Sequence, residues 1–135
     1  MKIAMNEKIT DAGYDNLIYD VNPKAEVMTV TFRKEASAEA TYKRGCVLAL
    51  STGTGADGKY VALGTTEVGS ETLTANAILC GDVTVGTDAD VTVLAYRTGH
   101  FNENALSFAG EYTFTAADKE ALRDVGILIS ESVEY

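Results

Sequence analysis

Length, composition and charge set the first limits on this chain. Its 135 residues fit one domain, and a hydrophobic content of 46% supports a folded core. The net charge of −9 disfavours nucleic acids and anionic membranes as partners, because phosphate binding requires clustered lysine and arginine. No stretch approaches the ~20 apolar residues of a membrane span, and residues 1–16 lack the pattern of a secretory signal peptide.

The two cysteines, Cys46 and Cys80, both stand in apolar stretches. A free cysteine in such a context behaves as a small hydrophobic residue. We therefore expect buried, reduced thiols, which agrees with synthesis in a cytoplasm. A disulfide between them stays open, because the sequence does not fix the separation of their Cα atoms.

The first 43 residues are predicted to be an N-terminal arm that carries one strand. A polar leader contains the only proline of the chain, Pro23, which disfavours helix in the residue before it. In residues 26–33, apolar side chains alternate with threonines, which predicts a strand with one apolar face. Residues 34–41 are charged and rich in alanine, and we expect a solvated linker there in preference to a short helical turn.

Residues 44–135 are predicted to form a compact β-rich domain. Residues 44–50 and 59–63 are apolar strand candidates, and Asp57 with Gly58 between them predicts a hairpin, since glycine tolerates the positive φ of such turns. Residues 64–74 are expected to form an irregular loop.

Residues 76–108 contain the pattern around which the domain is organised. An apolar run at residues 77–79 and runs rich in β-branched residues at 83–85 and 91–96 are separated by glycines and by an acidic turn at residues 87–90, which predicts paired strands. The last run ends at residues 97–101, where we expect His100 to be a turn residue between Gly99 and Phe101.

The C-terminal part predicts one short helix at residues 116–125. Thr115 can act as its N-cap with Asp118 in the capping-box position, and Gly126 can provide the C-cap. Residues 127–129 then form a last strand before an acidic tail. The predicted fold is mainly β with one short C-terminal helix, an α+β class.

No group of residues predicts a catalytic, metal or cofactor site. Residues 53–59 match the first seven positions of a phosphate-binding loop, but Tyr60 replaces the required Ser or Thr and a strand follows where a helix is needed. His100 is the only histidine, and Ser107 lacks a nucleophile-elbow setting. Asp82, Asp88 and Asp90 lack the order of a calcium-binding EF-hand, so we expect solvated turn residues.

The order of these features resembles the lambda-type, capsid-stabilising head decoration proteins of tailed bacteriophages. The resemblance runs from about Arg44 to Ile129 and includes the strand at 45–48, the Gly-rich turn with residues 58–60, the run 77–79, the acidic gap, the run 91–93, residues 98–101, the short helix and residues 126–129. Residues 1–43 match less well.

This resemblance implies a non-enzymatic protein without cofactors, synthesised in the bacterial cytoplasm and located on the outside of the expanded capsid. It implies homotrimers at local three-fold sites that bind the major capsid protein and brace the shell against packaged DNA. It also implies that the arm adds a strand to the capsid subunits, for which the strand pattern is suited. The candidate capsid contacts are Val27, Met28, Thr29, Val30, Thr31 and Phe32.

Two alternatives remain open at this point. The strand at residues 27–32 can instead pair within its own domain. The chain can also be a tail or fibre component, or a small receptor-binding protein with a binding surface at the loop 64–74. An enzyme is the least favoured class, because it would require a pocket with a perturbed acid or base.

Overall fold

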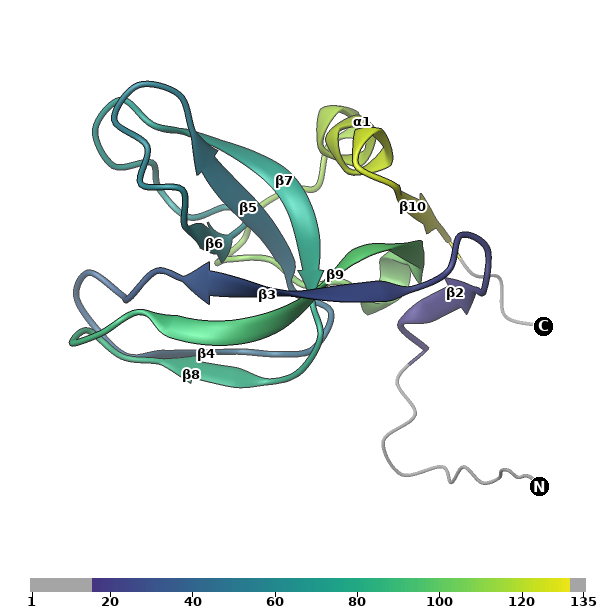
Figure 1. The fold of residues 1–135 in the computed structure, drawn as a ribbon, viewed down its shortest axis with the longest axis horizontal. Coiled ribbons are helices and arrows are strands. Elements are labelled where there is room, and N and C mark those ends of the chain that lie inside the picture. Colours follow the sequence, from purple (N-terminus) through teal and green to yellow (C-terminus); the bar gives the residue numbers. More distant parts are fainter. Residues whose placement is uncertain (1–15, 132–135) are drawn as a thin grey trace.

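The computed structural model describes residues 16–131, which fold mostly into β-strands with one short α-helix near the C-terminus, as predicted (Figure 1). The elements in chain order are β2 (Ile18–Asp20), β3 (Glu26–Phe32), β4 (Ala40–Tyr42), β5 (Val47–Thr52), β6 (Tyr60–Ala62), β7 (Thr72–Leu79), β8 (Val83–Val85), β9 (Val91–Asn102), the 3-10 helix η1 (Glu103–Ala105), α1 (Ala116–Asp124) and β10 (Ile127–Ser130).

Five strands close into a small barrel. The order β9-β3-β6-β5-β7 is completed by a pairing of β7 with β9, so that Ile78 lies opposite Tyr96. Most pairs are antiparallel, and β3 meets β6 in parallel only at Phe32 and Tyr60. A separate ribbon of β4 and β8 lies below the barrel in Figure 1. Closing the sheet removes exposed strand edges that would otherwise invite pairing with other chains.

Strand β9 serves two sheets in succession. From Val91 to Thr98 it pairs with β3, and from Gly99 to Asn102 it pairs with β10 in parallel. β2 also pairs with this second part, so β2, β9 and β10 form a small sheet at one end of the molecule (Figure 1).

The turn predicted at residues 97–101 is wrong, because β9 continues through Gly99, His100 and Phe101. Phe101 is fully buried, and the ring of this residue lies against the backbone of Gly99: a Cβ atom at Gly99 would stand 2.7 Å from its Cε2 and Cζ atoms. Gly99 is therefore needed inside a strand rather than in a turn, since only glycine leaves room for the aromatic ring.

The core lies on both sides of β5 and β7. Val47 and Ala49 of β5 pack into one buried cluster with Phe101 and the helix residue Leu122, whereas Cys46 and Leu48 pack into a second cluster with Phe32. A strand that is buried on both faces has a continuous apolar sequence. This explains why residues 45–49 show no alternation. Burial of each large side chain stabilises the fold by about 1.5–3 kcal/mol.

The hairpin and the strands flanking it form where the sequence predicts them, with shifted ends. β5 and β6 pair antiparallel with Leu50 opposite Tyr60, and Asp57 and Gly58 lie in their connection. β7 begins at Thr72, inside the predicted loop 64–74, because it pairs with β5 as far as Thr52.

The C-terminal helix is confirmed together with its capping box. The Thr115 hydroxyl accepts a hydrogen bond from the Asp118 amide at 3.1 Å, and an Asp118 carboxylate oxygen accepts one from the Thr115 amide at 3.0 Å. The helix ends at Asp124, with Val125 as the C-cap and the predicted cap residue Gly126 directly after it. Leu122 is the buried contact through which α1 packs on the sheet. The predicted last strand is β10.

Residues 34–39 contain no helix, in agreement with the preferred linker, and residues 40–42 form β4. Within residues 16–131 no helix is long and apolar enough to cross a membrane.

Candidate interaction surfaces

His100 holds three segments together at the end of the molecule where β2 and β10 lie. Its Nε2 atom lies 2.7 Å from the Ser130 hydroxyl, its Nδ1 atom lies 3.2 Å from the carbonyl oxygen of Asn22, and its ring packs on Tyr19 at 4.6 Å between centroids. A neutral ring that donates from Nδ1 to Asn22 accepts at Nε2 from Ser130. The serine that contacts His100 is thus Ser130, and not Ser107, which was weighed from the sequence as a nucleophile and set aside. We interpret these contacts as a structural latch between β9, β10 and the β2–β3 turn.

Two of the three acidic residues weighed as calcium ligands, Asp82 and Asp90, have separate partners. Asp82 accepts a hydrogen bond from the Arg44 amide at 2.8 Å and lies 3.6 Å from the Lys43 ammonium group. Asp90 forms an ion pair with Lys59 at 2.7 Å. These hydrogen bonds lower the pKa of both carboxyl groups. Among residues 16–131, no three His, Cys, Asp or Glu side chains gather as a metal site would require.

The Gly-rich residues 53–59 connect β5 to β6, so the loop leads into a strand and not into a helix. Its acidic residue, Asp57, is bound by Arg33 through two hydrogen bonds of 2.9 Å. The same guanidinium group forms an ion pair with Glu71 at 2.5 Å. A loop whose acidic residue is held by an arginine in this way has a structural role.

The ion network of Arg33, Asp57 and Glu71 was not foreseen from the sequence. Glu71 is only 4% exposed, and it also accepts hydrogen bonds from the Ser51 hydroxyl at 2.6 Å and the Val68 amide at 2.7 Å. Hydrogen bonds from Arg33 lower the pKa of Glu71 and of Asp57 to about 2, and they raise the pKa of Arg33. The network ties the loop of residues 53–58 to residues 64–71. No local motif signals it, because its members are distant in sequence.

The cysteines are free and differ in their surroundings. Cys46 is buried, as expected. Cys80 is only half-buried, although full burial was expected. Cys46 packs into the cluster of Leu48, and Cys80 packs against the cluster of Ile78 on the other side of the sheet. Burial raises the pKa of the Cys46 thiol to about 11.

The candidate capsid-binding strand is an internal strand of the barrel. β3 pairs with β9 along its whole length, as in the alternative in which this strand pairs within its own domain. Val30 and Phe32 are buried, and Met28 packs against the same cluster. They therefore cannot fill grooves of a partner while the barrel is intact. A capsid contact of this strand remains a prediction. Only the exposed side chains of Val27, Thr29 and Thr31 are available to make such a contact.

The predicted division into an arm of residues 1–43 and a domain of residues 44–135 also remains a prediction. Within the described part of the arm, β2 and β3 pair with β9, and β4 pairs with β8. Residues 1–15 of the predicted arm and residues 132–135 of the predicted tail lie outside the described residues.

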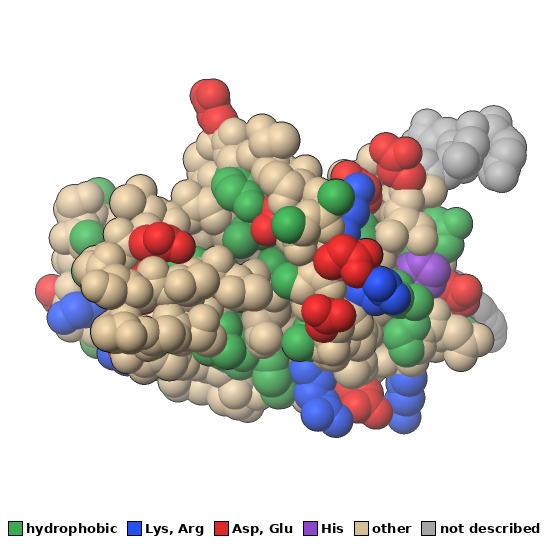
Figure 2. Space-filling view, turned by 90° about the horizontal axis from the view of Figure 1, so that it is seen from above, with side chains coloured by type: hydrophobic (Ala, Val, Ile, Leu, Met, Phe, Trp, Pro, Cys, Tyr) green, Lys and Arg blue, Asp and Glu red, His purple; other side chains and the backbone are tan. Residues whose placement is uncertain are grey.

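Exposed apolar side chains concentrate in two places. One is β2 and the turn after it, with Ile18, Tyr19 and the 75% exposed Val21. The other is the outer face of the β3–β9 pair, with Val27 and Leu94. On the face drawn in Figure 2, basic side chains lie next to acidic ones and do not gather alone.

The closed β-barrel with its short helix and these exposed apolar side chains defines the chain as a small β-rich protein. A comparison with protein families gives the particular family: the model described as "Bacteriophage lambda head decoration protein D" matches residues 7–128. The chain therefore belongs to the family of bacteriophage head decoration proteins, which are structural proteins of the virion. No curated protein matches the chain.

Proposed function

We propose that this protein binds the outer surface of an expanded tailed-phage capsid, as a homotrimer at local three-fold sites, and stabilises the shell against the pressure of packaged DNA. Its partner is the major capsid protein, it acts without catalysis, and it is made in the host cytoplasm before it joins the virion. The observation that carries the proposal is the family match over residues 7–128. Net negative charge is in keeping with an outer position, away from DNA.

The capsid contact is proposed to lie at the end of the molecule that carries β2. Ile18, Tyr19 and Val21 are exposed there within four residues of the chain, and residues 1–15 precede them closely in sequence. Exposed apolar side chains that cluster on a protein surface mark an interaction site. β2 itself lies within residues 1–43, the part of the chain for which an arm is predicted.

The test is co-sedimentation with expanded, undecorated capsids of the phage that encodes this chain. The wild type is expected to bind saturably, in a number of copies comparable to the capsid subunit. A variant without residues 2–15 and the variant Val21→Glu are each expected to bind at least tenfold more weakly, a loss of about 1.4 kcal/mol. The absence of wild-type binding at every concentration would refute the proposal.

Val68→Glu is the matched control for Val21→Glu. Both valines are exposed, at 64% and 75%, and both changes add one negative charge, but Val68 lies in the loop before β7. We expect Val68→Glu to bind capsids like the wild type. The rival receptor-binding function would use this loop, and no observation favours it over the family match.

A further inference from the structure

Asp57 and Gly58 form the only pair in the chain in which a glycine directly follows an aspartate or an asparagine. Glycine has no side chain to shield its backbone nitrogen or to limit its φ and ψ angles. The nitrogen of Gly58 can therefore reach the Cγ atom of Asp57 and close a succinimide ring. The connection between β5 and β6 thus contains a candidate site of spontaneous chemical modification.

The reaction at this pair needs only water as a co-reactant. A bond forms between the nitrogen of Gly58 and the Cγ atom of Asp57, and the hydroxyl of the carboxyl group leaves with the amide proton as water. A second water molecule then opens the ring. Opening at Cγ restores aspartate. Opening at the main-chain carbonyl carbon breaks the bond of that carbon to the Gly58 nitrogen, so the backbone then runs through Cγ, as isoaspartate.

The surroundings of Asp57 and Gly58 leave room for this reaction. Both residues are exposed, so water reaches the place where the ring would form. Gly58 has a φ of 72°, and apart from its chain neighbours no atom stands within 4 Å of the position of a Cβ. The backbone at Gly58 therefore meets no steric barrier to ring closure.

Arg33 opposes the reaction because it binds both oxygens of the Asp57 carboxylate. Its guanidinium group donates to each oxygen at 2.9 Å, and the Lys59 amide donates to one of them at 3.0 Å. An ionised carboxylate has no hydroxyl group to release, so the ring closes from the protonated acid. These hydrogen bonds lower the pKa of Asp57 to about 2. At about pH 5, such a group is protonated about 60-fold less often than one with the ordinary pKa of 3.8.

A second carboxylate keeps Arg33 in this position. The Arg33 side chain is only 16% exposed and also forms an ion pair with the buried Glu71 at 2.5 Å. Since Glu71 already orders the guanidinium group, little further conformational freedom is lost when Arg33 binds Asp57. The contact between Arg33 and Asp57 is thus a built part of the fold and not a chance pairing of two exposed side chains.

We propose that Asp57 is a site of isoaspartate formation, and that Arg33 slows this reaction in the folded protein by binding the Asp57 carboxylate. Isoaspartate lengthens the backbone of the β5–β6 connection by one carbon atom, so its carboxylate no longer fits Arg33 and the ion network opens. The inference is independent of the proposed function, because the reaction takes place in the purified protein.

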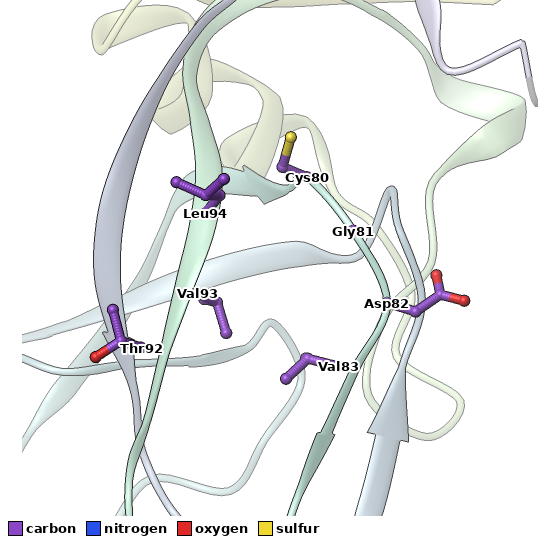
Figure 3. Close-up of a pocket in the computed structure, with 7 residues that line it drawn as sticks. All are labelled: Cys80, Gly81, Asp82, Val83, Thr92, Val93 and Leu94. Carbon is purple, nitrogen blue, oxygen red and sulfur yellow. The ribbon is translucent and has the colours of Figure 1, made fainter.

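Asp82 provides a reference site within the same chain. It lies in the connection from β7 to β8, and its carboxylate is exposed and accepts a hydrogen bond from a backbone amide, as that of Asp57 does. The next residue is Val83, and Figure 3 shows the side chains of Asp82 and Val83 pointing to opposite sides. The branched side chain of Val83 crowds its backbone nitrogen, so we expect no isoaspartate at Asp82.

The first experiment compares variants of the full-length protein after incubation at about pH 5, where the Arg33 contact is fully formed. Trypsin cleaves after Arg44 and Lys59, so Asp57 lies in the peptide of residues 45–59. Chromatography separates the isoaspartate form of this peptide, and mass spectrometry detects the succinimide by its loss of one water. Arg33→Lys keeps a positive charge beside Glu71, but one ammonium group cannot replace both hydrogen bonds to Asp57.

We expect isoaspartate at Asp57 to form at least tenfold faster in Arg33→Lys than in the wild type. Arg97→Lys makes the same change in the exposed pair with Glu26 and should match the wild type. Ser51→Ala tests whether a looser loop is sufficient. It removes a hydroxyl that binds Glu71 at 2.6 Å but leaves Arg33 on both carboxylates, so it should also match the wild type. Equal rates in Arg33→Lys and the wild type, or equal acceleration by Ser51→Ala, would overturn the role of Arg33.

A second measurement uses the unchanged protein and does not depend on the folding of a variant. The wild type is incubated at the same pH either folded or unfolded in urea. We expect isoaspartate at Asp57 to form at least tenfold more slowly in the folded chain, and none to form at Asp82 in either state. Equal rates at Asp57 in the two states would refute the protection by the fold. An unfolded chain without isoaspartate at Asp57 would refute the site itself.

Discussion

Glu71 is the buried member of the ion network with Arg33 and Asp57. It is buried, and it receives hydrogen bonds from Arg33, Ser51 and the amide of Val68. A buried carboxylate is tolerated only when it is paired and hydrogen-bonded. This network, rather than the turn sequence alone, positions the Gly-rich loop against residues 64–71.

The network predicts a specific dependence of stability on pH. The pKa values of Glu71 and Asp57 are about 2 in the folded protein, below the ordinary 4.5 and 3.8. Because a lowered pKa stabilises the fold only when the group is ionised, the stabilisation is complete above about pH 5 and is lost toward about pH 2. Urea unfolding at a series of pH values should show this loss.

The variant Glu71→Gln should show which residue is responsible. It leaves the half-buried Arg33 with less compensation, so the free energy of unfolding at neutral pH should fall by about 3 kcal/mol, and the acid dependence should become flatter. The control is Glu120→Gln, which removes an exposed partner of Arg123 and should change nothing measurable. Equal effects of the two changes would contradict the role of Glu71.

Gly99 allows a second prediction at the scale of a residue. Its φ of 147° and the Phe101 ring at 2.7 Å from the place of a Cβ both oppose a side chain. Gly99→Ala should therefore lower the free energy of unfolding by about 2–3 kcal/mol. Gly58→Ala is the control, since Gly58 has a φ of 72° but open space around it, and only the backbone cost of about 1 kcal/mol should appear. Equal losses of unfolding free energy in the two variants would show that the contact with the Phe101 ring adds nothing to the cost of a side chain at position 99.

At the scale of elements, α1 is specified by its own sequence. The capping box of Thr115 and Asp118 satisfies amides that the helix itself cannot pair. Thr115→Ala should lower the free energy of unfolding by about 1 kcal/mol. Thr113→Ala changes an exposed residue just before the helix and is expected to have a much smaller effect. Thermal unfolding followed by circular dichroism measures both, and a Thr115→Ala variant as stable as the wild type would argue against the cap.

Strand β3 shows what local pattern leaves open. The alternation of Met28, Val30 and Phe32 with threonines correctly indicates a strand with one apolar face. It does not say what covers that face, because a groove on a partner and the inside of a barrel impose the same period of two. The pairing with β9, more than sixty residues away in the chain at Thr29 and Leu94, decides between them.

At the scale of the whole molecule, the position of β3 predicts the result of N-terminal truncation. Removal of residues 2–15 leaves every described strand and both core clusters in place, so this variant should fold with a cooperative thermal transition. Removal of residues 2–34 deletes β3 and the 1% exposed Phe32, so it should abolish the transition. A cooperative transition in the longer deletion would show that β3 is dispensable.

The sequence by itself determined the β-rich class, the helix with its cap and the Asp57–Gly58 hairpin. These follow from features local to a few residues: alternation, turn chemistry and capping spacing. Only the tertiary structure decided that β3 belongs to the barrel, that β9 runs through Gly99, and that Arg33 joins Asp57 to Glu71. The position of Thr29 opposite Leu94 also depends on the register of β3 and β9. Each of these features is a pairing between distant segments of the chain. Such a pairing is selected by burial energy that many residues share, and no short window of the sequence contains that information.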